Sequence, residues 1–97
     1  GMTKTIAAEF GEQGVRAVAI CPGFISTEFH ESVNLRMAAE QGVSVEEIHD
    51  QRYQSVSMRR AGSPEEVGEL VAFAASPAAA YITGVALPVT GGVQMGL

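Results

Sequence analysis

The apolar positions of this chain follow two different spacings, which predict helices and strands in turn. From Met2 an apolar side chain recurs every four residues, and this spacing predicts a helix over residues 2–10. Residues 15–21 are apolar on both faces except at Arg16, and Pro22 stops the run. Such a run is typical of a fully buried strand in a parallel sheet.

Three further helices are predicted from hydroxyl residues that can cap a first turn. Two of these hydroxyl residues are followed three positions later by glutamate, which is the capping-box pattern. The other helix carries Phe29, Val33 and Met37 at a spacing of four, which predicts that they share its buried face. The expected helices cover about residues 28–41 after Thr27, 45–56 after Ser44 and 64–75 after Ser63.

A second strand is predicted at residues 85–89, where apolar side chains alternate. Pro88 has no amide hydrogen to donate, which predicts a position at a sheet edge. Two parallel strands do not make a stable sheet alone, because the first strand needs neighbours on both sides and helices on both faces. We therefore expect the C-terminal part of a larger α/β domain.

Composition excludes several classes of protein. The 97 residues can form one small domain at most. Six Lys and Arg against 11 Asp and Glu give a net charge of −5, which argues against binding to nucleic acid or to an anionic membrane. No apolar run approaches the ~20 residues of a membrane span. The single cysteine, Cys21, cannot form an internal disulfide, so we expect a cytoplasmic protein.

The segment from Pro22 to Thr27 is the strongest candidate for a binding site. Ligands of open α/β sheets bind beyond the carboxyl ends of the strands. Gly23 allows close approach of a ligand to the backbone, and the Thr27 hydroxyl at a helix N-terminus suits a phosphate or an amide carbonyl. The alternative is an ordinary turn in which Thr27 only caps the helix, and the residues alone leave both open.

Other residues with reactive or charged side chains give weaker signals. His30 and His49 lack the spacing of two helical metal ligands, so we expect them to be surface histidines. Cys21 lies in the predicted buried strand, where a thiol behaves as a small apolar group. Arg59 and Arg60 are expected to pair with carboxylates of the two preceding helices. The sequence contains no complete catalytic, metal-binding or dinucleotide motif.

Taken together and in order, these segments resemble the C-terminal part of the short-chain dehydrogenase/reductase family. The resemblance implies a Rossmann-like doubly wound parallel sheet, of which this chain supplies two strands and about four helices and is incomplete as a stand-alone domain. Cys21–Phe24 looks closest to 3-oxoacyl and polyketide ketoreductases. The segments that carry the resemblance are Thr3–Phe10, Gly14–Gly23, Arg60–Val67, Tyr81–Gly84 and Leu87–Gly92.

The resemblance also implies NAD or NADP as cofactor and hydride transfer between an alcohol and a ketone. At the matching positions, Pro22 and Gly23 would line the nicotinamide, and the Ile25 backbone would hold its carboxamide. Thr27 would contact the carboxamide or the diphosphate. Residues 28–60 match the substrate lid of the family within a single partial domain, 1–97. No catalytic residue and no metal ligand is assigned.

The family's glycine-rich cofactor turn, catalytic Ser and Tyr-x-x-x-Lys motif do not occur in these 97 residues. Proton transfer needs a positioned group of suitable pKa, so we expect no turnover and no cofactor bound by the chain alone. The alternative is a non-catalytic module, either a homo-oligomer or a subunit that joins a full-length reductase. The family's subunits meet through the parts that match Pro64–Ala75 and Val85–Val89, so we expect contact there.

Overall fold

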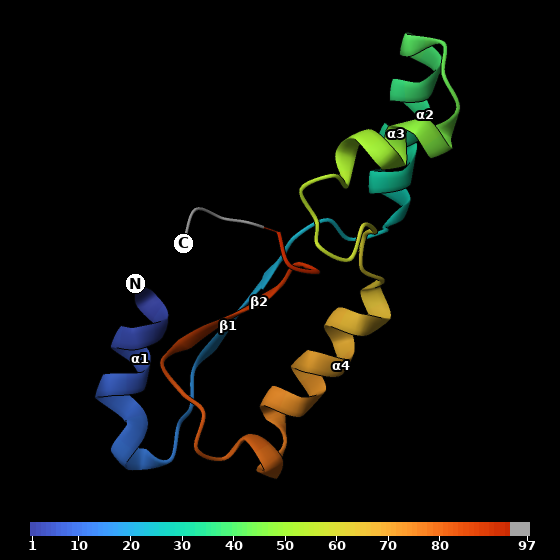
Figure 1. The fold of residues 1–97 in the computed structure, drawn as a ribbon. Helices are drawn as coiled ribbons and strands as arrows, with labels where there is room; N and C mark the ends of the chain where they lie inside the picture. The colour runs from blue at the N-terminus through green and yellow to red at the C-terminus, as the bar shows by residue number, and fades with distance from the viewer. Residues whose placement is uncertain (94–97) are drawn as a thin grey trace.

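The computed structural model describes residues 1–93, which form an elongated molecule around a short parallel sheet (Figure 1). Its extents are 57 × 26 × 20 Å and its radius of gyration is 17.1 Å. A compact chain of this length would have a radius of gyration of roughly 12 Å. The excess arises because one pair of helices projects beyond the end of the sheet (Figure 1).

The sheet consists of β1 (Val18–Pro22) and β2 (Val85–Val89), paired in parallel register from Val18 opposite Val85 to Pro22 opposite Val89. The bounds of β2 are those predicted. The prediction for β1 is wrong in two respects, since the strand begins three residues later and is not fully buried. Its first three residues are half-buried and Cys21 is exposed, because β2 is its only strand neighbour within residues 1–93.

Two helices flank the sheet on opposite sides (Figure 1). Helix α1 (Met2–Phe10) contacts β2, and α4 (Pro64–Ala75) contacts β1. Both have the predicted bounds. A 3-10 turn over Gly11–Gln13 follows α1 and ends at Gly14, whose positive φ of 81° favours glycine. Neither helix contains a buried residue, so each covers its face of the sheet only in part.

The crossover from β1 to β2 also contains α2 (Glu28–Gln41) and α3 (Val45–Arg52), which pack on each other. With the turns that follow α3, they form the α2–α3 unit, defined here as residues 28–56. Its buried residues include Ile48 and Val56, which are 0% and 1% exposed. This unit therefore has a small core of its own.

Two predictions for the α2–α3 unit are wrong. The predicted apolar face of α2 is not the buried one, since Phe29 is 78% exposed while Asn34 and Ala38 are buried. The reason is that α3 packs against the Asn34 side of the helix. Helix α3 also ends four residues earlier than predicted, because turns bring both Tyr53 and Val56 into the core. No helix within residues 1–93 combines the length and the hydropathy needed to cross a bilayer.

Candidate functional site

The candidate site lies where both parallel strands end. Pro22 and Val89 form the last pair of the sheet, and the Gly23 amide continues the ladder by donating to the Val89 carbonyl at 2.9 Å. A Cβ atom on Gly23 would lie 3.2 Å from the Cα of Thr90. Glycine at position 23 therefore lets the start of the loop pass close to the end of β2.

The loop of residues 23–27 is joined to the chain just before α4 by an isolated parallel bridge between Ile25 and Gly62. The Gly62 amide donates to the Phe24 carbonyl at 2.9 Å, and the Ser26 amide donates to the Gly62 carbonyl at 2.8 Å. In a parallel bridge of this kind, the backbone amide and carbonyl of Gly62 both face the loop. The amide and carbonyl of Ile25 point away from Gly62. The bridge thus presents the Ile25 amide on the other side of the loop, together with the Ile25 carbonyl, which accepts from the Thr27 amide at 2.9 Å and has a second lone pair for another donor.

Thr27 ends this loop and caps α2. Its hydroxyl oxygen accepts a hydrogen bond from the His30 amide at 3.1 Å, and its carbonyl accepts one from the Glu31 amide at 2.9 Å. The capping role is therefore confirmed. Because a hydroxyl can accept and donate together, the exposed Thr27 side chain can still donate its hydrogen to a ligand. Ligand contact by Pro22, Gly23, Ile25 and Thr27 stays a prediction.

Ser26 and Glu31 join the loop to α2 through a contact that the sequence did not predict. The Ser26 hydroxyl donates to Glu31 Oε1 at 2.7 Å, and this hydrogen bond is the main cause that lowers the pKa of Glu31. His49 Nε2 lies 3.6 Å from Glu31 Oε2, which adds a contact from α3. His49 and His30 are each half-buried, so the two expected surface histidines are covered in part by their neighbours.

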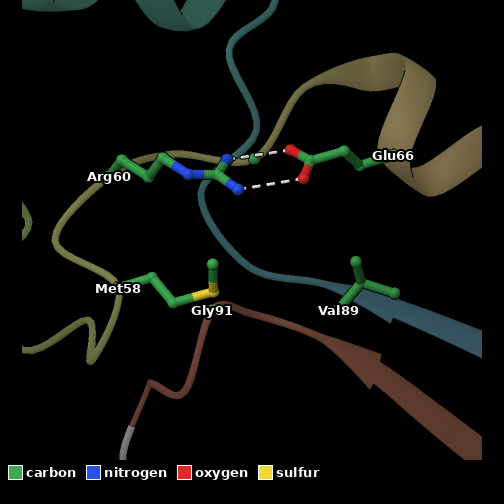
Figure 2. Close-up of a pocket in the computed structure, with 6 residues that line it drawn as sticks. Met58, Arg60, Glu66, Val89 and Gly91 are labelled. Carbon is green, nitrogen blue, oxygen red and sulfur yellow. Dashed lines mark hydrogen bonds and ion pairs between the residues drawn. The ribbon is translucent and has the colours of Figure 1, made fainter.

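A cavity of about 120 Å³ adjoins Gly62, the residue to which the loop is bridged. It has room for about four water molecules and is too small for a dinucleotide. Figure 2 shows the Arg60 and Glu66 side chains facing each other across one edge of it. The cavity is lined by Met58, Arg60, Gly62, Glu66, Val89 and Gly91.

Arg60 and Glu66 form a two-pronged ion pair, with N–O distances of 2.9 and 3.0 Å. Glu66 also accepts from the Ser63 amide at 2.8 Å, which completes the predicted capping box of α4. The hydrogen bonds from Arg60 are the main cause that lowers the pKa of Glu66 to about 2. The expected pairing of Arg60 with the preceding helices is wrong, because the capping box already holds Glu66 within its reach. Arg59 instead donates to the Gln54 and Val56 carbonyls.

The chemistry of this loop fits an amide ligand better than a metal ion. Within residues 1–93, no group of three or more His, Cys, Asp or Glu side chains is placed to hold a metal. A carboxamide group offers one acceptor oxygen and an NH₂ donor, which complement the Ile25 amide and carbonyl. The residues present therefore fit the carboxamide of a nicotinamide ring.

Comparison with known proteins identifies the class to which this arrangement belongs. A family described as "Enoyl-(Acyl carrier protein) reductase" matches residues 1–94. Similar proteins include oxidoreductases and structures described as short-chain dehydrogenases. The chain belongs to the short-chain dehydrogenase/reductase family.

Individual relatives agree with this assignment. The chain is 38% identical over 95 residues to the 3-oxoacyl-[acyl-carrier-protein] reductase FabG of Vibrio cholerae, covering 98% of this chain and 34% of that protein. It is similar to L-sorbose reductase of Gluconobacter frateurii, solved with NADPH and L-sorbose, with a TM-score of 0.88 and 27% identity. That match covers 99% of this chain and 37% of the other.

A third relative is a mutant 4-hydroxyisoleucine dehydrogenase solved with NADH and succinate. Its TM-score is 0.81 at 29% identity, covering 99% of this chain and 36% of the other. The chain thus spans about a third of the length of the relatives it matches. The expected partial Rossmann-like α/β fold is confirmed, with two strands and four α-helices within residues 1–93.

Proposed function

We propose that this chain supplies the nicotinamide-side loop of an NAD(P)-dependent oxidoreductase that interconverts a ketone and an alcohol. The observation that carries the proposal is the bridge to Gly62, which turns the Ile25 amide and carbonyl away from Gly62, two residues before the Thr27 hydroxyl that caps α2. Structures with NADPH and with NADH among the similar proteins support a nicotinamide cofactor and leave both forms open. The cytoplasm, with its reducing conditions, is the location that suits the lone Cys21.

In this proposal the residues of the loop bind and orient the ring. Ile25 would donate to the carboxamide oxygen and accept from its NH₂ group, while Pro22 and Gly23 would line the ring. Thr27 would donate its hydroxyl hydrogen while its oxygen still caps α2. The bound nicotinamide would supply or accept the hydride. The loop's own contribution is to fix the ring in one orientation, which is a recognised source of rate enhancement.

The same residues provide no proton donor for the reaction. The chain has one lysine, Lys4, and neither of its two tyrosines is followed by lysine at the fourth position. Tyr53 is buried, with its hydroxyl hydrogen-bonded inside the α2–α3 unit, and Tyr81 is fully exposed. We therefore propose that these 97 residues alone reduce no ketone. The resemblance to FabG supports a 3-oxoacyl substrate for the whole enzyme.

The chain alone is expected to bind no whole cofactor, so the binding proposal is tested by NMR with the nicotinamide half alone, nicotinamide mononucleotide, at a millimolar concentration that reveals weak contacts. We expect amide shifts centred on Ile25 and Thr27, because these groups would contact the carboxamide. Adenosine monophosphate has a ribose and a phosphate but no carboxamide, so it should leave the Ile25 amide unshifted. Shifts elsewhere in the chain, no shifts at all, or NADPH-dependent ketone reduction by the chain would contradict the proposal.

A second candidate function is self-association through α4 (Pro64–Ala75) and β2 (Val85–Val89). It is supported by the apolar side chains that these elements expose, since Val71 is 48%, Phe73 43% and Val85 39% exposed. Exposed apolar surface of this kind favours contact with another protein surface. A second copy of this chain or a full-length reductase subunit would provide it.

Light scattering on the purified chain tests this candidate. We expect a mass of at least twice 10.1 kDa for the natural sequence and a lower mass for Phe73→Glu. Gln41→Glu adds the same charge at the exposed end of α2 and should leave the mass unchanged. A single 10.1 kDa species for the natural sequence would rule out self-association.

A further inference from the structure

A directional chain of hydrogen bonds runs through the α2–α3 unit. Arg52 Nη1 donates to Asn34 Oδ1 at 2.5 Å, and Asn34 Nδ2 donates to the Tyr53 hydroxyl at 3.2 Å. The Tyr53 hydroxyl lies 2.7 Å from His30 Nε2. A guanidinium group has donors only, so Arg52 fixes the orientation of the Asn34 side-chain amide. This orientation sets which partner donates in each of the following hydrogen bonds.

This direction determines the protonation state of His30. The Tyr53 hydroxyl accepts from Asn34, and within residues 1–93 its one other hydrogen-bond partner is His30 Nε2, so its own hydrogen is directed to that nitrogen. The ring nitrogen that accepts this bond carries no hydrogen, so His30 is neutral and holds its hydrogen on Nδ1. The hydrogen bonds of Arg52, Asn34 and Tyr53 thus select the Nδ1–H tautomer of His30.

The groups around His30 oppose a positive charge on its ring. The ring lies against Tyr53 and Phe24, with centroid distances of 6.0 and 5.8 Å. Charged and titratable groups face it from its own helix, as Glu31, and from α3, as Arg52 and His49. Burial and then Arg52 lower the pKa of His30 below 6.5, and His49 lowers it further, while Glu31 opposes the shift.

Protonation of His30 would break the hydrogen-bond chain at Tyr53. A hydrogen on Nε2 would be donated to the second lone pair of the Tyr53 oxygen, and the Tyr53 hydroxyl hydrogen would then lose its acceptor. Asn34 is 0% and Tyr53 5% exposed, so the hydroxyl hydrogen would lose its acceptor in a largely buried position, which destabilises the closed unit. We propose that the α2–α3 unit is a pH-sensitive closure, which holds its two helices together while His30 is neutral and opens when His30 takes up a proton.

This inference is independent of the proposed cofactor binding and can be tested without a ligand. In ¹⁵N NMR of the 97-residue chain at neutral pH, we expect the His30 ring to carry its hydrogen on Nδ1 and to titrate below 6.5. Amide protection of α2 and α3, corrected for intrinsic exchange, should be lost through the same titration, while β1 and β2 keep theirs. A hydrogen on Nε2, or titration at or above 6.5, would overturn the proposal.

Two variants and a control distinguish opening caused by protonation of His30 from a general loss of stability in acid. Tyr53→Phe removes the hydroxyl and keeps the ring, so the pKa of His30 should rise. His30→Gln keeps an acceptor for Tyr53 but cannot be protonated, so protection of α2 and α3 should lose its pH dependence. His49→Gln removes the other nearby histidine and should keep that dependence.

Retention of the pH dependence in His30→Gln, or its loss in His49→Gln, would refute the assignment to His30. If Tyr53→Phe does not fold, the tautomer and titration of His30 in the natural sequence still decide the question.

Discussion

The α2–α3 unit and the sheet with its two flanking helices differ in where they bury their side chains. Within residues 1–93, five of the six buried residues lie between Asn34 and Val56, and the sixth is Ala79 in the turn after α4. Helices α1 and α4 and both strands contain none. The α2–α3 unit therefore has a core of its own, while the larger sheet region does not.

The comparison shows that regular secondary structure and a core are separate properties of this chain. The sheet region has a complete capping box on α4 and a continuous ladder between its strands, yet Met2 is 79% and Val71 48% exposed. A groove between β1 and α4, lined in part by Val18 and Ile20, is likewise open. The sheet region thus has apolar surface that needs another surface to cover it, whereas the α2–α3 unit has buried its apolar surface internally.

The largest expected effect comes from removing the centre of the α2–α3 core. Ile48→Ala deletes most of a fully buried side chain, and such changes cost about 2–5 kcal/mol. We expect amide protection in α2 and α3 to collapse while β1 and β2 keep theirs, because the two regions do not share a core. Native-state hydrogen exchange read residue by residue measures this.

The matched control is Leu35→Ala, on the same unit but 60% exposed, which should change stability by less than about 0.5 kcal/mol. If Ile48→Ala unfolded the strands together with α2 and α3, the two regions would form a single cooperative unit and the comparison would fail.

The next effect concerns the connection between the two regions. After α3 the chain docks on the end of β2, where the Ser57 hydroxyl donates to the Gly92 carbonyl and the Met58 amide to the Gly91 carbonyl, both at 2.9 Å. Gly92 has a φ of +89°, and a Cβ there would lie 2.6 Å from the Ser57 side chain. Gly92→Ala should therefore cost about 1–3 kcal/mol and release the Met58 amide to exchange.

Gly68→Ala on α4 is the control for Gly92→Ala and should have the opposite effect on stability. A Cβ at position 68 meets nothing within 4 Å, and the backbone there is helical. It should stabilise α4 by about 0.5–1 kcal/mol. Equal effects of the two substitutions, measured by denaturant unfolding, would show that docking at Gly92 does not hold the regions together.

The same comparison explains how far the sequence could predict the fold. The bounds of α1, α2, α4 and β2 were predicted correctly, because caps and breakers such as Thr27, Ser63 and Pro64 act within a few residues. The buried face of α2 and the end of α3 were not predicted. Both depend on how Tyr53 and Val56 turn back into the core, which is a tertiary contact.

The candidate site shows the same division between local and distant causes. Its position at Pro22–Thr27 follows from where a strand ends, and the cap on α2 follows from one hydroxyl residue. The bridge that turns the Ile25 backbone outward depends on Gly62, far along the chain, and no local pattern reveals it. The expected burial of Cys21 was wrong for the same reason, since burial of a strand depends on its neighbours.

The smallest expected effect is the acid sensitivity of the Arg60–Glu66 ion pair, which links the segment before α4 to the first turn of that helix. The pKa of Glu66 is lowered from its ordinary 4.5 to about 2, chiefly by hydrogen bonds from Arg60. The folded chain thus favours the carboxylate, and the pair's contribution to stability is complete above about pH 4.5 and is lost as the pH falls toward 2. Because both side chains are about half exposed, that contribution is small.

A carboxyl-detected NMR titration of Glu66 measures this shift, and Arg60→Gln should raise the pKa of Glu66 toward 4.5. Arg59→Gln is the control, because Arg59 donates to backbone carbonyls and its replacement should leave the pKa of Glu66 unchanged.

The α2–α3 unit should begin to open as the pH falls below 6.5, because the neutral form of His30, which has a lowered pKa in the folded chain, stabilises the fold fully only above that value. The Arg60–Glu66 ion pair should weaken only below pH 4.5. Acid should therefore affect the α2–α3 unit first and this ion pair second. Simultaneous loss of both would mean that His30 does not control the unit separately.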